Sequence, residues 1–154
     1  MVGPQHPGMN IGPSDPDCPD LHLTLWLHVS QQETLPVEAR FHYDRANPFA
    51  VSVIFSNAAG GAVTWVLSRE LLMAGLLRPS GEGDVRIWPP CRRHGGTNLH
   101  VLLLGRTGAA LLDVAILPVR AWLADTFALV PVDTEAQSID WDSSFERVLH
   151  RRYW

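Results

Sequence analysis

Apolar and polar positions alternate along residues 21–29, "LHLTLWLHV". Leucine or valine fills every second position, and histidine, threonine or tryptophan stands between them. Alternation with period two is typical of an antiparallel strand with one buried and one outer face. Similar runs at 37–43, 49–55 and 63–67 predict three more strands, the last two joined by a hairpin loop at "SNAAGG".

The period then changes to that of a short helix. Ser68 can cap its start, Glu70 lies where the helix dipole favours an acid, and Gly75 is expected to end it. The alternating pattern resumes after this helix. It predicts three further strands, at 84–89, 98–105 and 109–117.

Two helices are predicted to follow the last strand. Val119, Trp122, Leu123 and Phe127 recur at i, i+3, i+4 and i+8, which is the spacing of one apolar helix face. A second helix is predicted at 140–152, where arginines at the C-terminal end suit the helix dipole.

Together these elements predict an α+β fold. Its largely antiparallel sheet is built of two β-meander-plus-helix units, and a C-terminal helix completes one domain over 21–154. Residues 1–20 hold five prolines and three glycines and almost nothing that a core could bury. They are predicted to be a disordered leader.

Composition narrows the class of protein. Apolar residues make up 46% and charged residues 18% of the 154 residues, as in a soluble globular domain. No apolar run approaches the roughly 20 residues of a membrane helix, and the N-terminus lacks the pattern of a signal peptide. These observations predict a cytoplasmic protein without membrane insertion, whose two cysteines, Cys18 and Cys91, are free thiols.

The "GEGD" motif raises the possibility of a phosphate-binding loop. Such loops follow a strand and open a helix, whereas this one follows a helix and opens a strand. Glu82 and Asp84 would repel phosphate, and the chain has no lysine. The motif therefore predicts a tight turn whose glycines supply positive φ angles.

Other catalytic and metal-binding patterns are weak. His22, His28, His42 and His100 fall on the polar positions of predicted strands, but no Cys-x-x-Cys, His-Glu-x-x-His or carboxylate cluster accompanies them. No nucleophile motif is present, and Ser68 is better explained as a helix cap. The sequence predicts no catalytic residue, metal or cofactor, and a protein that is not an enzyme.

Two kinds of binding surface remain open. Arg86, Trp88, Arg92 and Arg93 could hold a nucleic-acid single strand by stacking and charge, although a net charge of −4 argues against nucleic acid. Exposed tryptophans on the sheet would instead suit a protein partner. The strand at 21–29, if left at a sheet edge, would also favour pairing with another chain.

Two longer stretches resemble the SsgA-like sporulation and cell-division proteins of actinomycetes. They are "RFHYDRANPFAVSVIF" and "VTWVLSRELLMAGLLRPSGEGDVRIWP", and the similarity spans about 21–132. The residues that match the family signature, and that are candidates for interaction, are Trp65, Arg69, Glu70, Arg78, Gly81, Gly83, Asp84, Arg86 and Trp88. Within this signature, Arg78 and Asp84 are expected to pair inside one subunit.

The resemblance implies a non-enzymatic adaptor in sporulation-specific septation or spore-wall morphogenesis. It implies a whirly-like fold and a homotrimer that is recruited to the septum. The implied partners are the tubulin-like division protein FtsZ, the peptidoglycan machinery or another SsgA-like protein. The leader and the residues after 132 depart from the family pattern, so the sporulation step stays open.

Overall fold

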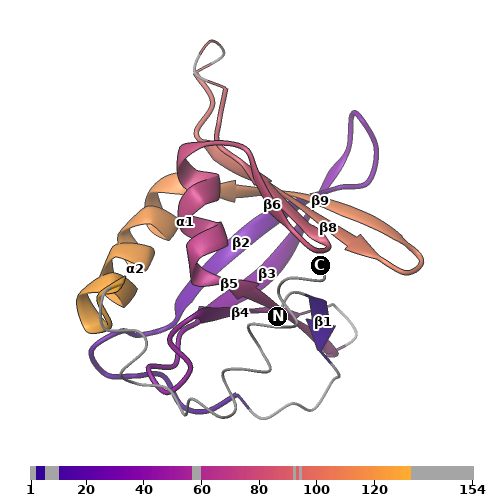
Figure 1. Cartoon of the computed structure of the whole chain (residues 1–154). Helices are drawn as coiled ribbons and strands as arrows, with labels where there is room; N and C mark the ends of the chain where they lie inside the picture. The colour runs from indigo at the N-terminus through magenta and orange to yellow at the C-terminus, as the bar shows by residue number, and fades with distance from the viewer. Residues whose placement is uncertain (1–2, 6–10, 57–59, 92, 94, 133–154) are drawn as a thin grey trace.

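The computed structural model describes residues 3–5, 11–56, 60–91, 93 and 95–132. In this part of the chain, nine strands form one curled antiparallel sheet and two helices pack against it (Figure 1). The elements are β1 (Gly3–Gln5), β2 (Leu21–His28), β3 (Thr34–His42), β4 (Ala50–Ser56), β5 (Ala62–Ser68), α1 (Arg69–Leu77), β6 (Ser80–Glu82), β7 (Val85–Trp88), β8 (Asn98–Gly105), β9 (Gly108–Ala115) and α2 (Ile116–Leu129). The predicted α+β class and antiparallel sheet are confirmed.

The strand order is β1-β5-β4-β3-β2-β9-β8-β7-β6. Strands β2 to β5 are neighbours in sequence order and lead into α1, and β6 to β9 are neighbours and lead into α2. The two runs meet where Trp26 pairs with Asp113 and Leu27 with Leu112. The second run has four strands and not the three that the sequence predicted, because the short β6 precedes β7.

The strand at 21–29, whose place in the sheet the sequence left open, is not an edge strand. Strand β2 lies between β3 and β9, and β1 and β6 form the two edges of the sheet. Strand β2 pairs with β3 along its length and with β9 at Trp26 and Leu27.

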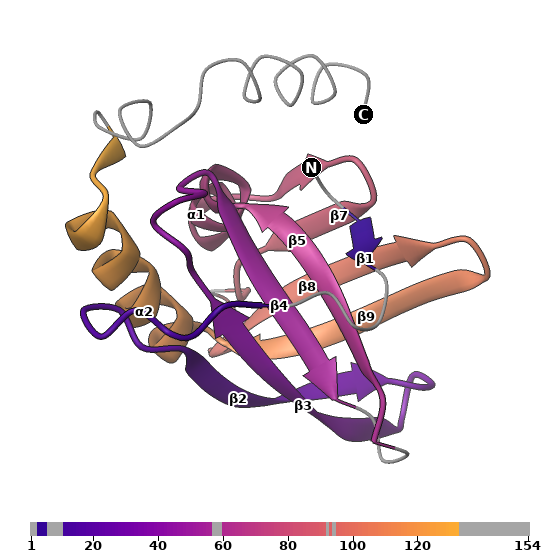
Figure 2. The same ribbon diagram turned by 90° about the horizontal axis from the view of Figure 1, so that it is seen from below.

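Inward-facing side chains of both runs form a single core. Figure 2 shows β3, β4 and β5 crossing β8 and β9, so that the two inner faces meet. Leu25, Trp65, Val101 and Leu112 are among the residues that line this contact. They enclose a cavity of about 20 Å³, which is close to the least space that one water needs. This cavity is therefore too small for a small-molecule ligand.

Helix α1 contacts β5, β6, β7 and α2. The predicted cap at Ser68 is confirmed, since its Oγ accepts a hydrogen bond from the Leu71 N–H at 2.8 Å. The predicted stop at Gly75 is wrong, because Gly75 is buried inside α1. A Cβ there would lie 2.3 Å from Cγ2 of Ile87, so the missing side chain lets α1 approach β7 closely.

Helix α2 follows β9 directly. Val119, Trp122 and Leu123 are buried as predicted, and Phe127 is partly buried. The Trp122 ring meets Phe41 of β3 edge to face, with centroids 5.8 Å apart. The helix predicted at 140–152 lies outside the described residues.

The predicted disorder before residue 21 is wrong for the part that the structure describes. Gly3–Gln5 pairs with β5 as the edge strand β1. Cys18 is fully buried, and the Pro19 carbonyl accepts a hydrogen bond from the Trp122 indole at 3.0 Å. Proline richness did not prevent order next to β2, because Pro19 bonds to α2 and Asp20 bonds to β3.

Candidate interaction surface

The nine signature residues do not gather into one site. Trp65 points into the core and is only 8% exposed, so it cannot be an exposed anchor for a partner. Glu70 and Arg78 are exposed at the two ends of α1. The remaining residues fall into three places: a buried arginine, the β6–β7 hairpin, and the outer face of the sheet.

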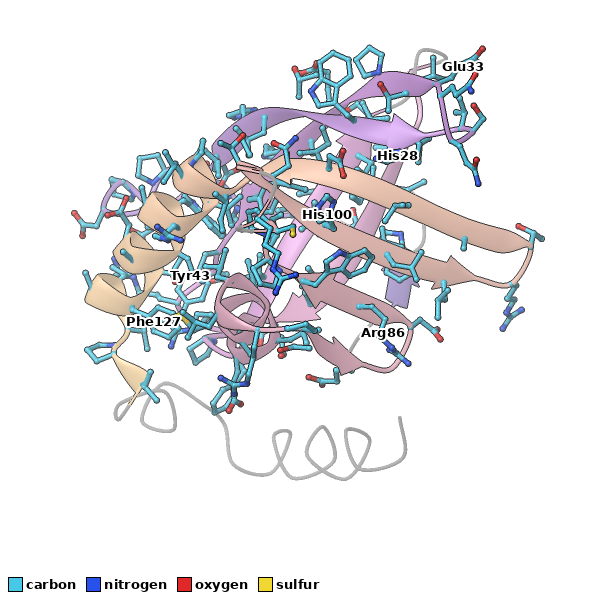
Figure 3. All side chains as sticks on the ribbon, turned by 90° about the horizontal axis from the view of Figure 1, so that it is seen from above. His28, Glu33, Tyr43, Arg86, His100 and Phe127 are labelled. Carbon is cyan, nitrogen blue, oxygen red and sulfur yellow. The ribbon has the colours of Figure 1, made fainter. Side chains whose placement is uncertain are left out.

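Arg69 joins the start of α1 to the end of α2. Its Nη1 donates a hydrogen bond to the Thr126 carbonyl at 2.9 Å. Its guanidinium carbon lies 4.1 Å from the centre of the Phe127 ring and 5.1 Å from that of Tyr43. Figure 3 shows both rings between the two helices. Arg69 is 1% exposed, so its role in this arrangement is to hold the helices together and not to meet a partner.

The "GEGD" stretch is the hairpin between β6 and β7. Gly83 has φ +57°, a conformation that favours glycine, so the predicted turn chemistry holds at this position. A Cβ on Gly81 would lie 2.5 Å from Cδ of Arg86, because the arginine side chain crosses the glycine. Arg86 then folds back, and its Nη1 donates to the carbonyls of Gly83 at 2.7 Å and Val85 at 2.9 Å.

The expected ion pair between Arg78 and Asp84 is absent among the residues that the structure describes. Arg78 is exposed beyond the end of α1, and Asp84 lies at the tip of the hairpin. The Asp84 carbonyl instead accepts the Leu104 N–H at 2.8 Å. The hairpin tip is thus fixed to β8 by its backbone.

Trp88 belongs to a row of side chains across the outer face of the sheet. Strand pairing places Trp26 opposite Asp113, Asp113 opposite His100, and His100 opposite Trp88. The rings of Trp88 and His100 stack with centroids 5.5 Å apart. Together with His28, which lies two residues after Trp26, these residues are called the outer row below.

Asp113 holds the centre of the outer row. Its Oδ2 lies 2.9 Å from Nε2 of His28, and its Oδ1 lies 2.7 Å from Nδ1 of His100. Figure 3 shows His28 on β2 and His100 on β8, on either side of β9. One carboxylate thus accepts a hydrogen bond from each imidazole and fixes the positions of both rings.

Across the described ranges, no group of three or more His, Cys, Asp or Glu side chains could hold a metal ion. Both oxygens of Asp113 are already bonded to the imidazoles. The arrangement offers aromatic surface and fixed polar groups, which suit recognition of a partner.

A second polar cluster connects the N-terminal segment to β3. Asp20 accepts hydrogen bonds from Nη1 of Arg40 at 3.0 Å and from the imidazole of His42 at 2.8 Å. The side chains of Asp20 and His42 are 3% and 6% exposed. Sequence reasoning missed this cluster and Asp113, because in each case the partners lie on segments far apart in the chain.

The two cysteines lie in different environments. Cys18 is fully buried, and burial, with smaller contributions from Asp125, Asp15 and Asp20, raises its pKa to about 11. The thiol is therefore protonated at neutral pH and is a poor nucleophile. Cys91 is exposed.

Comparison with known proteins identifies the family. The family model described as "Streptomyces sporulation and cell division protein, SsgA" matches residues 37–135, which is more than half of the chain. The chain belongs to the SsgA family. The resemblance noted in the sequence is thereby confirmed.

Relatives within the SsgA family cover most of the chain. The sporulation-specific cell division protein SsgB of Streptomyces coelicolor is 41% identical over 84% of this chain and 93% of that protein. The protein of the same name from Salinispora tropica is 36% identical over 89% of this chain and 96% of that protein.

Solved structures of SsgA-family proteins have the same fold. One structure comes from work on SsgB mutations and longitudinal cell division in Streptomyces coelicolor. It aligns with a TM-score of 0.72 at 41% identity, and the alignment covers 77% of this chain and 93% of that chain. The structure of an SsgA-like protein of Thermobifida fusca aligns with a TM-score of 0.72 at 32% identity. The alignment covers 83% of this chain and 93% of that chain. In the described part of this SsgA-family chain, neither helix is long and apolar enough to span a membrane.

Proposed function

We propose that this SsgA-family chain is an adaptor in sporulation-specific cell division. The observation that carries the proposal is its 41% identity to a sporulation-specific cell division protein, over 93% of that protein's length. The structure is compatible with an adaptor, because the cavity beside Leu25 and Trp65 in its core measures only about 20 Å³ and its outer face presents aromatic and polar groups.

The finer proposal concerns the partners. The chain would form a homotrimer, localise to the septum, and recruit or position FtsZ, the peptidoglycan machinery or another SsgA-like protein. Trp26 supports this role, since it is 45% exposed on the outer face of the sheet, and tryptophan is enriched among residues that dominate protein–protein binding. The likeness to whirly proteins stays a prediction.

Single-strand nucleic-acid binding is the alternative. Stacked Trp88 and His100 on an antiparallel sheet favour it. The hydrogen bonds of Arg86 to its own hairpin and the carboxylate of Asp113 in the row oppose it. If oligonucleotide binding occurs and falls steeply with salt, it would support this alternative over the adaptor.

The direct test is genetic. The gene is deleted in the organism that encodes it, and septa and spores are counted by microscopy before and after complementation with the wild-type gene. We expect sporulation septa or spore walls to be defective in the deletion strain and restored by complementation. Normal septation and spore walls in the deletion strain would contradict a division role.

A further inference from the structure

Trp26 lies between two carboxylates on the outer face of the sheet. Asp113 stands directly opposite it on β9. On β3, Trp26 pairs with Pro36, and Glu38 lies two residue pairs along on the same face, where it accepts a hydrogen bond from the Thr24 hydroxyl at 2.7 Å. Directly opposed and diagonal cross-strand neighbours are close enough to contact a shared ligand. The exposed indole is therefore flanked by an acid on each side.

Two arginines of the same face already have partners within the chain. Arg40 pairs with Asp20 at 3.0 Å, and Arg86 donates to the carbonyls of its own hairpin. The surroundings of Trp26 therefore favour a cation. A cation over an indole face is attracted by the ring quadrupole, and a nearby carboxylate strengthens the contact by a charge-assisted hydrogen bond.

An apolar hollow adjoins this position. It has a volume of about 430 Å³ and is lined by Leu102, Ala109 and Leu111 of β8 and β9, and by His28 with the three residues after it. Leu111 lies two residues before Asp113 on the same strand and the same face. Two residues of a strand span roughly 6.6 Å, and an extended peptide presents alternate side chains to one face at the same interval.

We propose that this surface binds an extended segment of a partner protein that carries an arginine or lysine and an apolar side chain two positions away. The cation lies on Trp26 between Glu38 and Asp113, and the apolar side chain enters the hollow beside Leu111. The bonds from His28 and His100 hold the Asp113 carboxylate in place before the partner arrives, which lowers the cost of ordering on binding. The inference rests on the proposed function, because it names the chemistry of the segment that the adaptor holds.

The test uses the full chain and the fluorescein-labelled peptide Gly-Ser-Arg-Ser-Leu-Ser-Gly, followed by fluorescence anisotropy. We expect saturable binding that weakens when NaCl is raised from about 50 to about 300 mM, because partly exposed charges are screened. Replacing the peptide's arginine by uncharged citrulline should weaken binding at least about threefold. A peptide with arginine and leucine adjacent should also bind more weakly, since their side chains then point to opposite faces.

Two pairs of variants locate the site. Trp26→Ala and Glu38→Gln should each weaken binding at least about threefold, because each removes a contact with the cation. Asp125→Asn, at an exposed residue of α2, is the matched control for the acid, and Leu117→Ser, at a residue 65% exposed on α2, is a control for loss of apolar surface. Both controls should bind as wild type does. Circular-dichroism melts verify that all four variants fold.

Equal binding of the citrulline peptide, unchanged binding by folded Trp26→Ala, or no saturable binding at all would overturn the proposal. Competition by a dT15 oligonucleotide that depends on Trp26 would assign the face to nucleic acid instead. A peptide-induced fall in sedimenting mass would assign it to a second copy of the chain. If the peptide test fails while the deletion strain still shows defective septa, the assigned surface is wrong and the proposed function stands.

Discussion

Gly75→Ala is expected to destabilise the protein, although alanine is the better helix former. The added Cβ would lie 2.3 Å from Cγ2 and 2.5 Å from Cβ of Ile87. Contacts below 3.0 Å force α1 or β7 to move, and overpacking of a core costs about 1–3 kcal/mol. The gain in helix propensity is about 1 kcal/mol. We therefore expect a net loss of up to about 2 kcal/mol in the free energy of unfolding.

Urea unfolding followed by circular dichroism measures this loss. The midpoint should fall in Gly75→Ala with little change in the slope, because the surface exposed on unfolding is nearly the same. Met73→Ala is the control, since Met73 is exposed on the same helix, and its effect should stay within about 0.5 kcal/mol. The loss of stability caused by Gly75→Ala should be smaller in an Ile87→Ala background, because the Ile87 Cγ2 atom nearest to the added Cβ is then gone.

The sign of the stability change in Gly75→Ala shows whether α1 and β7 are in close contact. If α1 were not pressed against β7, Gly75→Ala would stabilise the protein by about 1 kcal/mol, as at an exposed helix position. A higher urea midpoint in Gly75→Ala would therefore refute the close approach of α1 and β7.

Three further predictions follow from the same contacts. Arg69→Ala should lower stability by about 3 kcal/mol or more in thermal or urea unfolding, because it empties a buried site and removes one of the two hydrogen bonds that the Thr126 carbonyl accepts; a loss below about 1 kcal/mol would contradict its role between the helices. Ser68→Ala should cost about 1 kcal/mol by removing the helix cap, whereas Ser68→Asp, which can also cap, would place a second acid beside Glu82 and should not restore full stability. With Ellman's reagent one thiol of the native protein, Cys91, should react fast, and two thiols should react in the unfolded protein. Since burial raises the folded pKa of Cys18 to about 11, its contribution to stability should be lost as pH rises from about 9 to about 11. This alkaline loss of stability should be absent in Cys18→Ser.

Local patterns predicted the local elements well. Period-two alternation marked β2 to β5 and β7 to β9, and the serine before the first helix marked its cap. These signals depend on a residue and its near neighbours. Strand β6 was missed because three residues around a glycine carry no alternation, and β1 was missed because its assignment rests on backbone pairing with β5.

The outer row could not be predicted from the sequence. His28 and Asp113 are 85 residues apart, and they meet only because β2 pairs with β9. The sequence placed His28 and His100 on polar strand positions, but it did not show that one carboxylate joins them. The same holds for Gly75, whose local signal is that of a helix stop and whose role depends on Ile87 across the helix–sheet contact.

Localisation of a fluorescent fusion during sporulation tests the central claim most directly. The fusion is expressed from the native locus in the organism that encodes the chain, together with a marker for FtsZ, and is followed by time-lapse microscopy. We predict that the signal gathers at sporulation septa or the spore wall as they form. A functional fusion that stays diffuse through septation and spore maturation would contradict the account.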